Sequence, residues 1–281
     1  MGRQQRSAAT VSPPCTLRVG CVAALAATVT VCAAAVAAPL GLFDLHPSSL
    51  GTAAALAVVS PGATAAVLNC AAVPQEPGLH VEATAGSRLG TDVLLAFSGT
   101  LAGRGPGTLL WAVTGGSTYL KATAGGAAPL GSRGSVGGAF AYDSDPLHGG
   151  GSFSLGLHVS GRVLELGMCV RRLGASLLGD GGPVAFDVAA LLTATPRFAL
   201  GFAAQMDKTS REVAFGAQAS IWSALLRWGI SLDTGGSITG AGIGLGLTPL
   251  GVPVNVALGL VGTSLAPCAS ISSSLASAPW W

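Results

Sequence analysis

The most regular pattern in the chain lies in residues 150–170, where large apolar side chains alternate with small or polar ones. A period of two is typical of a β-strand with one apolar face. The alternation is interrupted at Ser160-Gly161, which predicts a β-hairpin closed there by a two-residue turn, because glycine tolerates the positive φ of tight turns. The apolar positions are Phe153, Leu155, Leu157, Val159, Leu164, Leu166, Met168 and Val170.

A two-residue turn would also fix how the two strands pair. With Val159 opposite Arg162, Leu157 lies opposite Leu164 and the large side chains share one face. A shift of one residue would move one strand's apolar set to the other face, so the faces are strongly specified. The same register also pairs Leu155 with Leu166 and Phe153 with Met168.

Similar alternation recurs through residues 79–281 and predicts roughly ten to fourteen strands joined by short turns. A second hairpin is specified well enough to predict its pairing. Its strands flank the loop 207–210, with Phe202 opposite Phe215 and Ala204 opposite Val213. No part of this region predicts a long helix.

The face opposite the large apolar side chains distinguishes a soluble sandwich from a membrane barrel. That face is mostly Gly, Ala and Ser, and charged residues make up only 9% of the chain. In a membrane barrel the apolar face meets lipid, small residues leave room in the lumen, and closure satisfies every backbone group. We therefore predict an all-β fold, a transmembrane antiparallel β-barrel, with a soluble secreted β-sandwich of structural role as the alternative. The terminal Trp280-Trp281 fits the barrel, because outer-membrane barrels commonly end on an aromatic residue.

Residues 1–37 have the pattern of a secretory signal peptide. Three arginines precede the apolar run 19–34, and Ala35-Val36-Ala37 has the small-x-small form of a cleavage site. An uncleaved membrane anchor is the alternative, because the run is nearly long enough to span a bilayer. The formal net charge is +2, so losing these arginines leaves −1 and no basic surface for nucleic acid.

Residues 38–78 form a separate segment, which we predict to be an N-terminal plug. Residues 50–73 carry no charge, so a transmembrane helix has to be considered. Pro61-Gly62 interrupts that stretch and favours two short elements joined by a turn. Beyond residue 78 the chain changes from continuous apolar runs to the alternating pattern of a barrel, which occupies residues 79–281.

Short motifs in both regions resemble one family of outer-membrane barrels. They are Leu50-Gly51-Thr52-Ala53, Asn69-Cys70-Ala71-Ala72, Gly137–Asp143 and Leu164–Leu173. They resemble the long-chain fatty-acid transporter superfamily, in particular its compact branch common in spirochaetes and Bacteroidetes, although Cys70 takes the place of the usual proline. The resemblance implies that the N-terminal segment, with Leu50, Gly51 and Asn69, folds into the lumen as a plug. It also implies passage of hydrophobic small molecules such as long-chain fatty acids.

The sequence offers no support for an enzyme. It contains no G-x-S-x-G, no H-E-x-x-H and no phosphate-binding loop. Asp143-Ser144-Asp145 opens like a calcium loop, but Leu147 stands at a ligand position. After signal-peptide removal Cys70, Cys169 and Cys268 remain, without metal-ligand spacing. We expect no catalytic residue, metal or cofactor, and we expect these cysteines to be buried. Whether two of them form a disulfide is left open.

Because side chains alternate between the two faces of each strand, a set of polar side chains is assigned to the lumen. We predict that Glu165 has a cationic neighbour, Arg171 or Arg227, because an unpaired charge in a poorly hydrated site is costly. These side chains either pair with one another and with the plug or line a ligand path. The candidates for that path are His158, Glu165, Arg171, Asp187, Gln205, Gln218 and Arg227, and the same parity also assigns Glu82, Arg88 and Asn255 to the lumen.

These features predict a non-enzymatic channel in the outer membrane of a diderm bacterium, exported through its signal peptide and taking up hydrophobic small molecules. The alternative within the same fold is a binding or shuttle partner of a secretion or surface-assembly system. The expected partners are outer-membrane lipids, the hydrophobic ligand and the barrel-assembly machinery, which would engage the C-terminal strand. Nucleic acid is not expected.

Overall fold

The computed structural model describes residues 52, 55, 56, 59, 65–73, 78–88, 92–102, 107–116, 120–144, 150–174, 183–208, 210–249, 252–261 and 264–276. The predicted signal peptide, Leu50, Gly51 and Trp280-Trp281 lie outside these residues. The described chain contains one short helix, α3 (Ala65–Leu68), ahead of the strands. None of the described helical residues forms a helix long and apolar enough to cross a bilayer.

The described residues form fourteen β-strands. They are β1 (Gly78–Arg88), β2 (Asp92–Ala102), β3 (Thr108–Gly115), β4 (Leu120–Leu130), β5 (Gly134–Asp143), β6 (Gly150–Val159), β7 (Leu164–Leu173), β8 (Ala185–Thr195), β9 (Phe198–Met206), β10 (Arg211–Ile221), β11 (Ala224–Asp233), β12 (Ile238–Leu247), β13 (Val254–Val261) and β14 (Ser264–Ala276).

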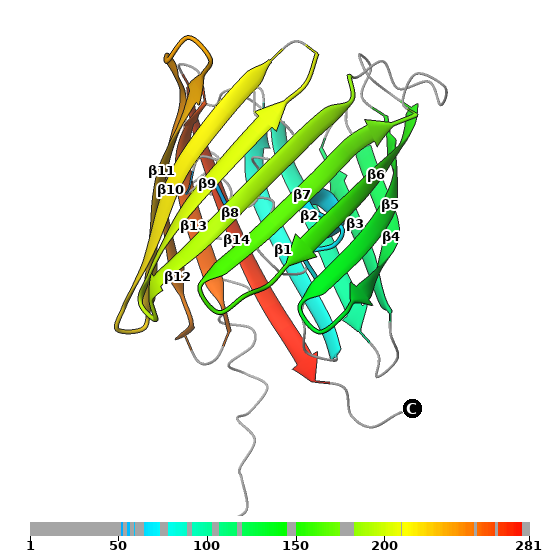
Figure 1. Cartoon of the computed structure of the whole chain (residues 1–281), viewed down its shortest axis with the longest axis horizontal. Coiled ribbons are helices and arrows are strands. Elements are labelled where there is room, and N and C mark those ends of the chain that lie inside the picture. The colour runs from blue at the N-terminus through cyan, green and yellow to red at the C-terminus, as the bar shows by residue number, and fades with distance from the viewer. Residues whose placement is uncertain are drawn as a thin grey trace, which may run out of the picture.

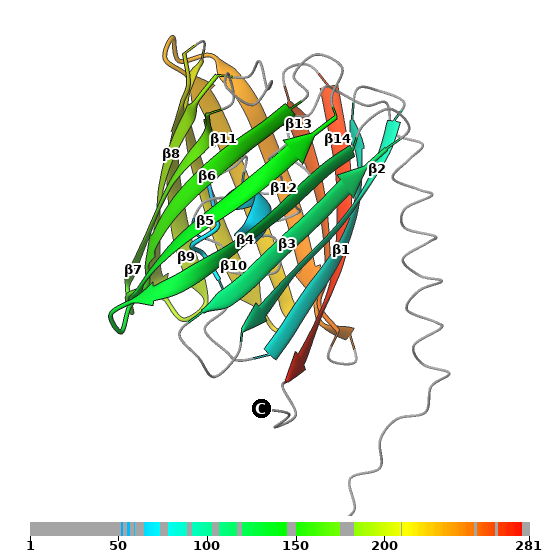
Figure 2. The same ribbon diagram turned by 90° about the vertical axis from the view of Figure 1, so that its right-hand side faces the viewer.

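The strands close into one antiparallel barrel. Each strand pairs with its neighbours in sequence, and β1 pairs with β14 to complete the ring. Figures 1 and 2 show the strands strongly tilted around it. Closure confirms the predicted barrel, and the two-sheet sandwich is wrong. Gly78 pairs with Ala276, so β1 begins and β14 ends at the same end of the barrel.

The outer surface of the barrel carries the large apolar side chains, as the alternating pattern predicts. Leu155 is 55% exposed and Leu109 is 63% exposed, although neither contacts water in a bilayer. Cross-strand aromatic pairs reinforce this surface: the ring centroids of Phe140 and Phe153 are 5.1 Å apart. An exposed apolar belt around a closed barrel is what a membrane-spanning barrel requires.

The pairing of β6 with β7 differs from the predicted register. Leu157 pairs with Met168, not with Leu164, so β7 is displaced by four residues. The displacement is even, and the apolar side chains therefore keep the predicted face. The predicted two-residue turn is wrong, because residues 160–163 connect the strands and the φ of Gly161 is not positive. The second predicted hairpin is confirmed: Phe202 pairs with Phe215 and Ala204 with Val213.

The described residues of the plug segment (52, 55, 56, 59 and 65–73) lie inside the barrel, as both views show (Figures 1 and 2). The helix α3 packs against β2, β3 and β4. Small side chains dominate both partners, which allows the plug to lie close to the wall. One cluster joins plug residues Ala55, Leu56, Val59 and Leu68 to wall residues Cys169, Ala189, Ala203 and Ala214. A second cluster joins Ala65, Ala66, Cys70 and Val73 to Leu110, Ala112, Ala127 and Ala139.

Candidate functional site

The candidate site is the barrel lumen, formed by the inner wall and the plug. Inward-facing positions on the strands carry hydroxyl, charged or very small side chains, whereas the neighbouring positions carry the apolar belt. This division follows from the period of two, because successive side chains of a strand point to opposite faces. Buried polar residues of the inner wall include Glu82, Thr84, Ser98, Thr114, Thr123, Ser135, Ser152, His158, Arg171, Asp187 and Ser270.

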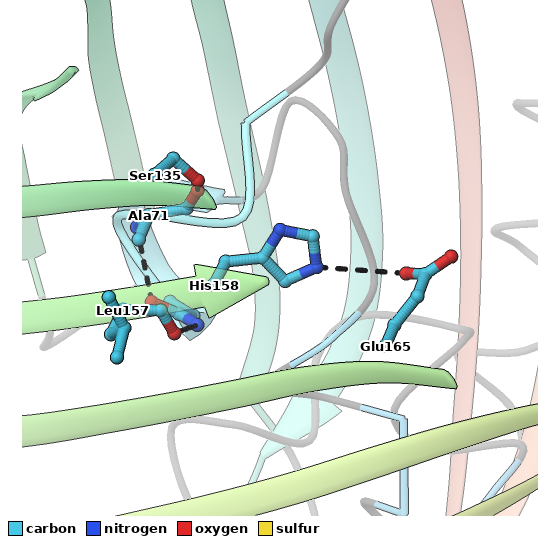
Figure 3. Close-up of polar contacts among 6 residues, drawn as sticks. Ala71, Ser135, Leu157, His158 and Glu165 are labelled. Carbon is cyan, nitrogen blue, oxygen red and sulfur yellow. Dashed lines mark hydrogen bonds and ion pairs between the residues drawn. The ribbon is translucent and has the colours of Figure 1, made fainter. Parts of the chain in front are cut away.

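The plug is held to β5 and β6 by hydrogen bonds around Asn69. Asn69 Nδ2 donates to the carbonyl oxygen of Leu157 at 3.2 Å, and its Oδ1 accepts from the amide of Ala71 at 3.1 Å. Ser135 Oγ donates to the carbonyl oxygen of Ala71 at 2.6 Å (Figure 3). Asn69 is itself fully buried, so these bonds satisfy groups that have no access to bulk water.

Glycines on the inner wall allow the plug to approach this closely. A Cβ on Gly137 would overlap the carbonyl of Cys70, and one on Gly156 would overlap Asn69 Oδ1. At the other end of the plug, a Cβ on Gly216 would lie 2.8 Å from Ala55 Cβ, and one on Gly229 would overlap the Thr52 carbonyl. The plug therefore contacts β5, β6, β10 and β11 at positions where a side chain would not fit.

Arg171 and Asp187 form a buried ion pair between β7 and β8. Arg171 Nε lies 2.5 Å from Asp187 Oδ2, and Nη2 lies 2.8 Å from Oδ1. This bidentate geometry is the strong form of an arginine–carboxylate pair. The positively charged Arg171 is therefore not the partner of Glu165.

Glu165 faces the lumen, but its neighbour is His158 and neither predicted arginine. His158 Nε2 lies 3.6 Å from Glu165 Oε2 (Figure 3). His158 pairs with Gly167, so the displaced register places Glu165 diagonally across from the imidazole. The predictions of Arg171 and Arg227 as partners are wrong: Arg171 lies six residues further along β7 and pairs with Asp187, and Arg227 lies on β11 and contacts Asn255. Within the described residues neither ring nitrogen of His158 has a hydrogen-bond partner.

Arg227 lies on another part of the wall, where its Nη1 donates to Asn255 Oδ1 at 3.0 Å. Of the two predicted glutamines, Gln218 pairs across the strands with Arg227, and Gln205 pairs with Asp187. Both glutamines are half-buried. The structure thus places the predicted residues on the inner wall at three separate points, and it does not gather them into one cluster.

The described cysteines are buried thiols, and no group of metal-ligating side chains occurs among the described residues. Burial raises the pKa of the Cys70 thiol to about 11. The thiol therefore stays protonated at neutral pH, as expected for a cysteine that packs between plug and wall.

Sequence analysis named Asn69 as a plug residue, but it did not identify the wall residues that hold the plug. Ser135 and Gly137 contact a segment more than sixty residues earlier in the chain. No pattern within one strand predicts a contact at such a separation. One signal was available: Gly137 and Gly156 both occupy lumen-facing positions of otherwise regular strands. Glycine weakens a strand, so its use there indicates the close approach of another backbone.

No family model matches the chain, and no curated protein matches it. Among solved structures, the chain is similar to the CymD monoaromatic hydrocarbon channel, with a TM-score of 0.62 and 13% identity over 85% of this chain and 99% of that one. It is also similar to the KdgM porin, with a TM-score of 0.45 and 10% identity over 70% of this chain and 99% of that one. The similarity to CymD identifies the fold: this chain is a β-barrel of the outer-membrane type.

Proposed function

We propose that this protein is a non-enzymatic channel through which small hydrophobic molecules cross the outer membrane of a diderm bacterium. The observation that carries the proposal is the division between the two faces of the wall. The outer face is an apolar belt, and the inner face encloses a small-residue and polar lumen that contains part of the chain. A closed wall of this kind provides a path that is separated from the lipid.

Two further points support the choice of ligand. The chain has the fold of CymD, a protein described as a monoaromatic hydrocarbon channel. The motifs around Leu50 and Asn69 resemble those of the long-chain fatty-acid transporter superfamily. Long-chain fatty acids are therefore the second ligand class of the proposal. Export would use residues 1–37 as a signal peptide, and β14 would engage the barrel-assembly machinery.

Uptake into cells of a diderm host that carries the protein in its outer membrane tests the proposal. The labelled probes are toluene, a long-chain fatty acid and, for comparison, a small sugar. We expect faster entry of toluene, the fatty acid or both than in cells without the protein, and little change for the sugar. Unchanged entry of both hydrophobic probes with a correctly folded barrel would contradict the proposal.

Two adjacent residues of β13 provide a matched pair of variants. Ala257 faces the lumen and is buried, whereas Leu258 faces lipid and is exposed. Ala257→Trp puts an indole into the proposed path, and Leu258→Trp adds the same group outside it. We expect Ala257→Trp to slow uptake and Leu258→Trp to leave it unchanged, with heat-modifiable gel migration confirming that both barrels fold. Equal uptake by the two variants would mean that the ligand does not pass along this wall.

A further inference from the structure

The inner face of β12 carries no side chains, and the guanidinium of Arg227 from β11 lies over it. Gly240, Gly242, Gly244 and Gly246 all face inward, because the alternate residues of β12 belong to the apolar outer face. Arg227 reaches across this bare strand to Asn255. A Cβ on Gly246 would lie 2.8 Å from Asn255 Oδ1 and 3.5 Å from Arg227 Nη1. The glycine face thus gives the guanidinium room to lie along the wall.

Two polar groups next to Asn255 lack hydrogen-bond partners among the described residues. Within the described residues, Arg227 Nε and Ser270 Oγ are both buried and have no hydrogen-bond partner. Ser270 has no exposed surface, and it pairs across the strands with Asn255, the residue that Arg227 contacts. Buried donors and acceptors are almost always satisfied by protein, water or ligand. The unpartnered pair therefore indicates that another molecule completes this site.

The charges around Arg227 favour a neutral molecule. Glu82, buried on β1, lies close enough to Arg227 to interact with it electrostatically. β1 pairs with β14, the strand that carries Ser270. Arginine and carboxylate offset each other, and an incoming carboxylate would be repelled by Glu82. A hydroxyl group both donates and accepts, so it matches a site that offers unpaired guanidinium and hydroxyl groups beside a carboxylate.

We propose that the wall site formed by Arg227, Asn255 and Ser270, beside the glycine face of β12, binds the hydroxyl group of a small, uncharged, otherwise apolar molecule. The expectation that this molecule has an apolar body rests on the proposed channel function, whereas the preference for a hydroxyl group rests on the wall residues themselves. The ligand class is an alcohol or a phenol. The site lies beside the plug, because a Cβ on Gly229, two residues from Arg227, would overlap the Thr52 carbonyl.

Fluorine NMR on the detergent-solubilised full protein tests this site without requiring transport. The probes are para-fluorobenzyl alcohol, para-fluorotoluene and para-fluorobenzoate. We expect saturable binding of the alcohol and weaker binding of the other two probes. Arg227→Lys, which keeps the charge and removes Nε, and Ser270→Ala should each weaken alcohol binding about three- to tenfold, the usual value of one hydrogen bond.

Ser231→Ala is the matched control, because Ser231 is another buried lumenal serine but its Oγ already pairs with Thr239 Oγ1 at 3.0 Å. It should leave alcohol binding unchanged. Equal binding of the three probes, tighter binding of the benzoate, or equal effects of Ser270→Ala and Ser231→Ala would each overturn the proposal. Heat-modifiable gel migration verifies that each variant folds. If Ser270→Ala does not fold, the effect of Arg227→Lys on alcohol binding tests the proposal by itself. Failure of hydrophobic uptake in cells, with this binding intact, would reject the channel function alone.

Discussion

Gly137 of β5 and Gly156 of β6 are paired directly across the sheet, and both lie against the plug around Cys70. The two glycines form a flat patch on the inner wall, and a Cβ at either position would overlap an atom of the plug. Asn69 and Ser135 then fix the plug on this patch through their hydrogen bonds. The lack of a side chain at these two glycines therefore determines the position of the plug as much as the hydrogen bonds do.

Replacement of Gly137 should displace the plug without unfolding the barrel. In Gly137→Ala the new Cβ overlaps the backbone of Cys70, which cannot rotate away as a side chain could. We expect a higher ion conductance in planar bilayers than for the unaltered protein. Gly138→Ala is the control, because its Cβ would face outward at an ordinary 3.6 Å from Leu155 Cδ2. Deletion of residues 50–73 should give the upper limit of conductance, and unchanged conductance in that deletion would contradict an occluding plug.

The thiol of Cys70 should report the same displacement chemically. The rise in its pKa from 9.0 to about 11 lowers the thiolate fraction about a hundredfold at neutral pH. Since the thiolate is the reactive form, alkylation by iodoacetamide should be slow at neutral pH and increase as the pH rises towards 11. Mass spectrometry of the Cys70 peptide measures this rate. Faster labelling is expected in Gly137→Ala, and fast labelling of the unaltered protein at neutral pH would show that Cys70 is not buried.

Removal of only one partner of the Arg171–Asp187 ion pair should strongly destabilise the barrel. Asp187→Ala leaves the guanidinium buried and without its carboxylate, which costs about 3–5 kcal/mol. Urea titration of the detergent-folded barrel measures the loss. The double variant Arg171→Met with Asp187→Leu should recover most of it, because no charge is then left unpaired. A double variant as unstable as the single one would mean that packing, rather than charge, is responsible.

Lipid contact should make the centre of β6 intolerant of charge. Leu155 lies at the middle of the strand and is exposed on the outer face. Leu155→Arg should destabilise the barrel by about 2–4 kcal/mol, whereas Leu164→Arg, at the first residue of β7, should cost about 1 kcal/mol or less. Folding titrations into lipid vesicles compare the two variants. Equal costs would mean that the apolar belt does not meet the bilayer core.

Alternation, together with the small-residue composition of the opposite face, was sufficient to predict the barrel and the outward face of the strands that it identified, because side-chain direction within a strand depends only on parity. It was not sufficient for the register of β6 and β7, since a displacement of four residues leaves parity unchanged. Hydrogen bonds to residues outside β6 and β7 hold the observed connection, residues 160–163, in place. The amide of Ser160 bonds to the Arg133 carbonyl at 2.7 Å, and the amide of Thr193 bonds to the Val163 carbonyl at 2.7 Å.

The partner of Glu165 was not predicted either, although both registers place His158 diagonally across from it. In the predicted register Glu165 lies opposite Gly156, two residues from His158, and in the observed register His158 pairs with Gly167, two residues from Glu165. The prediction considered only arginines as partners and did not consider the imidazole. Contacts between strands that are not neighbours, such as that of Arg227 with Asn255 over the glycine face of β12, depend on three strands at once. No pattern within one strand predicts them.

The seam between β1 and β14 limits how far the plug can move from the barrel. The plug precedes β1 in the chain but lies within the ring, and Val73 and Gly78 are five residues apart, a span of at most about 18 Å. Gly78 pairs with both Ala276 and Ala102, so the first residue of β1 is fixed in the wall on two sides. The C-terminal end of a displaced plug therefore stays within this distance of the barrel end where β1 begins and β14 ends.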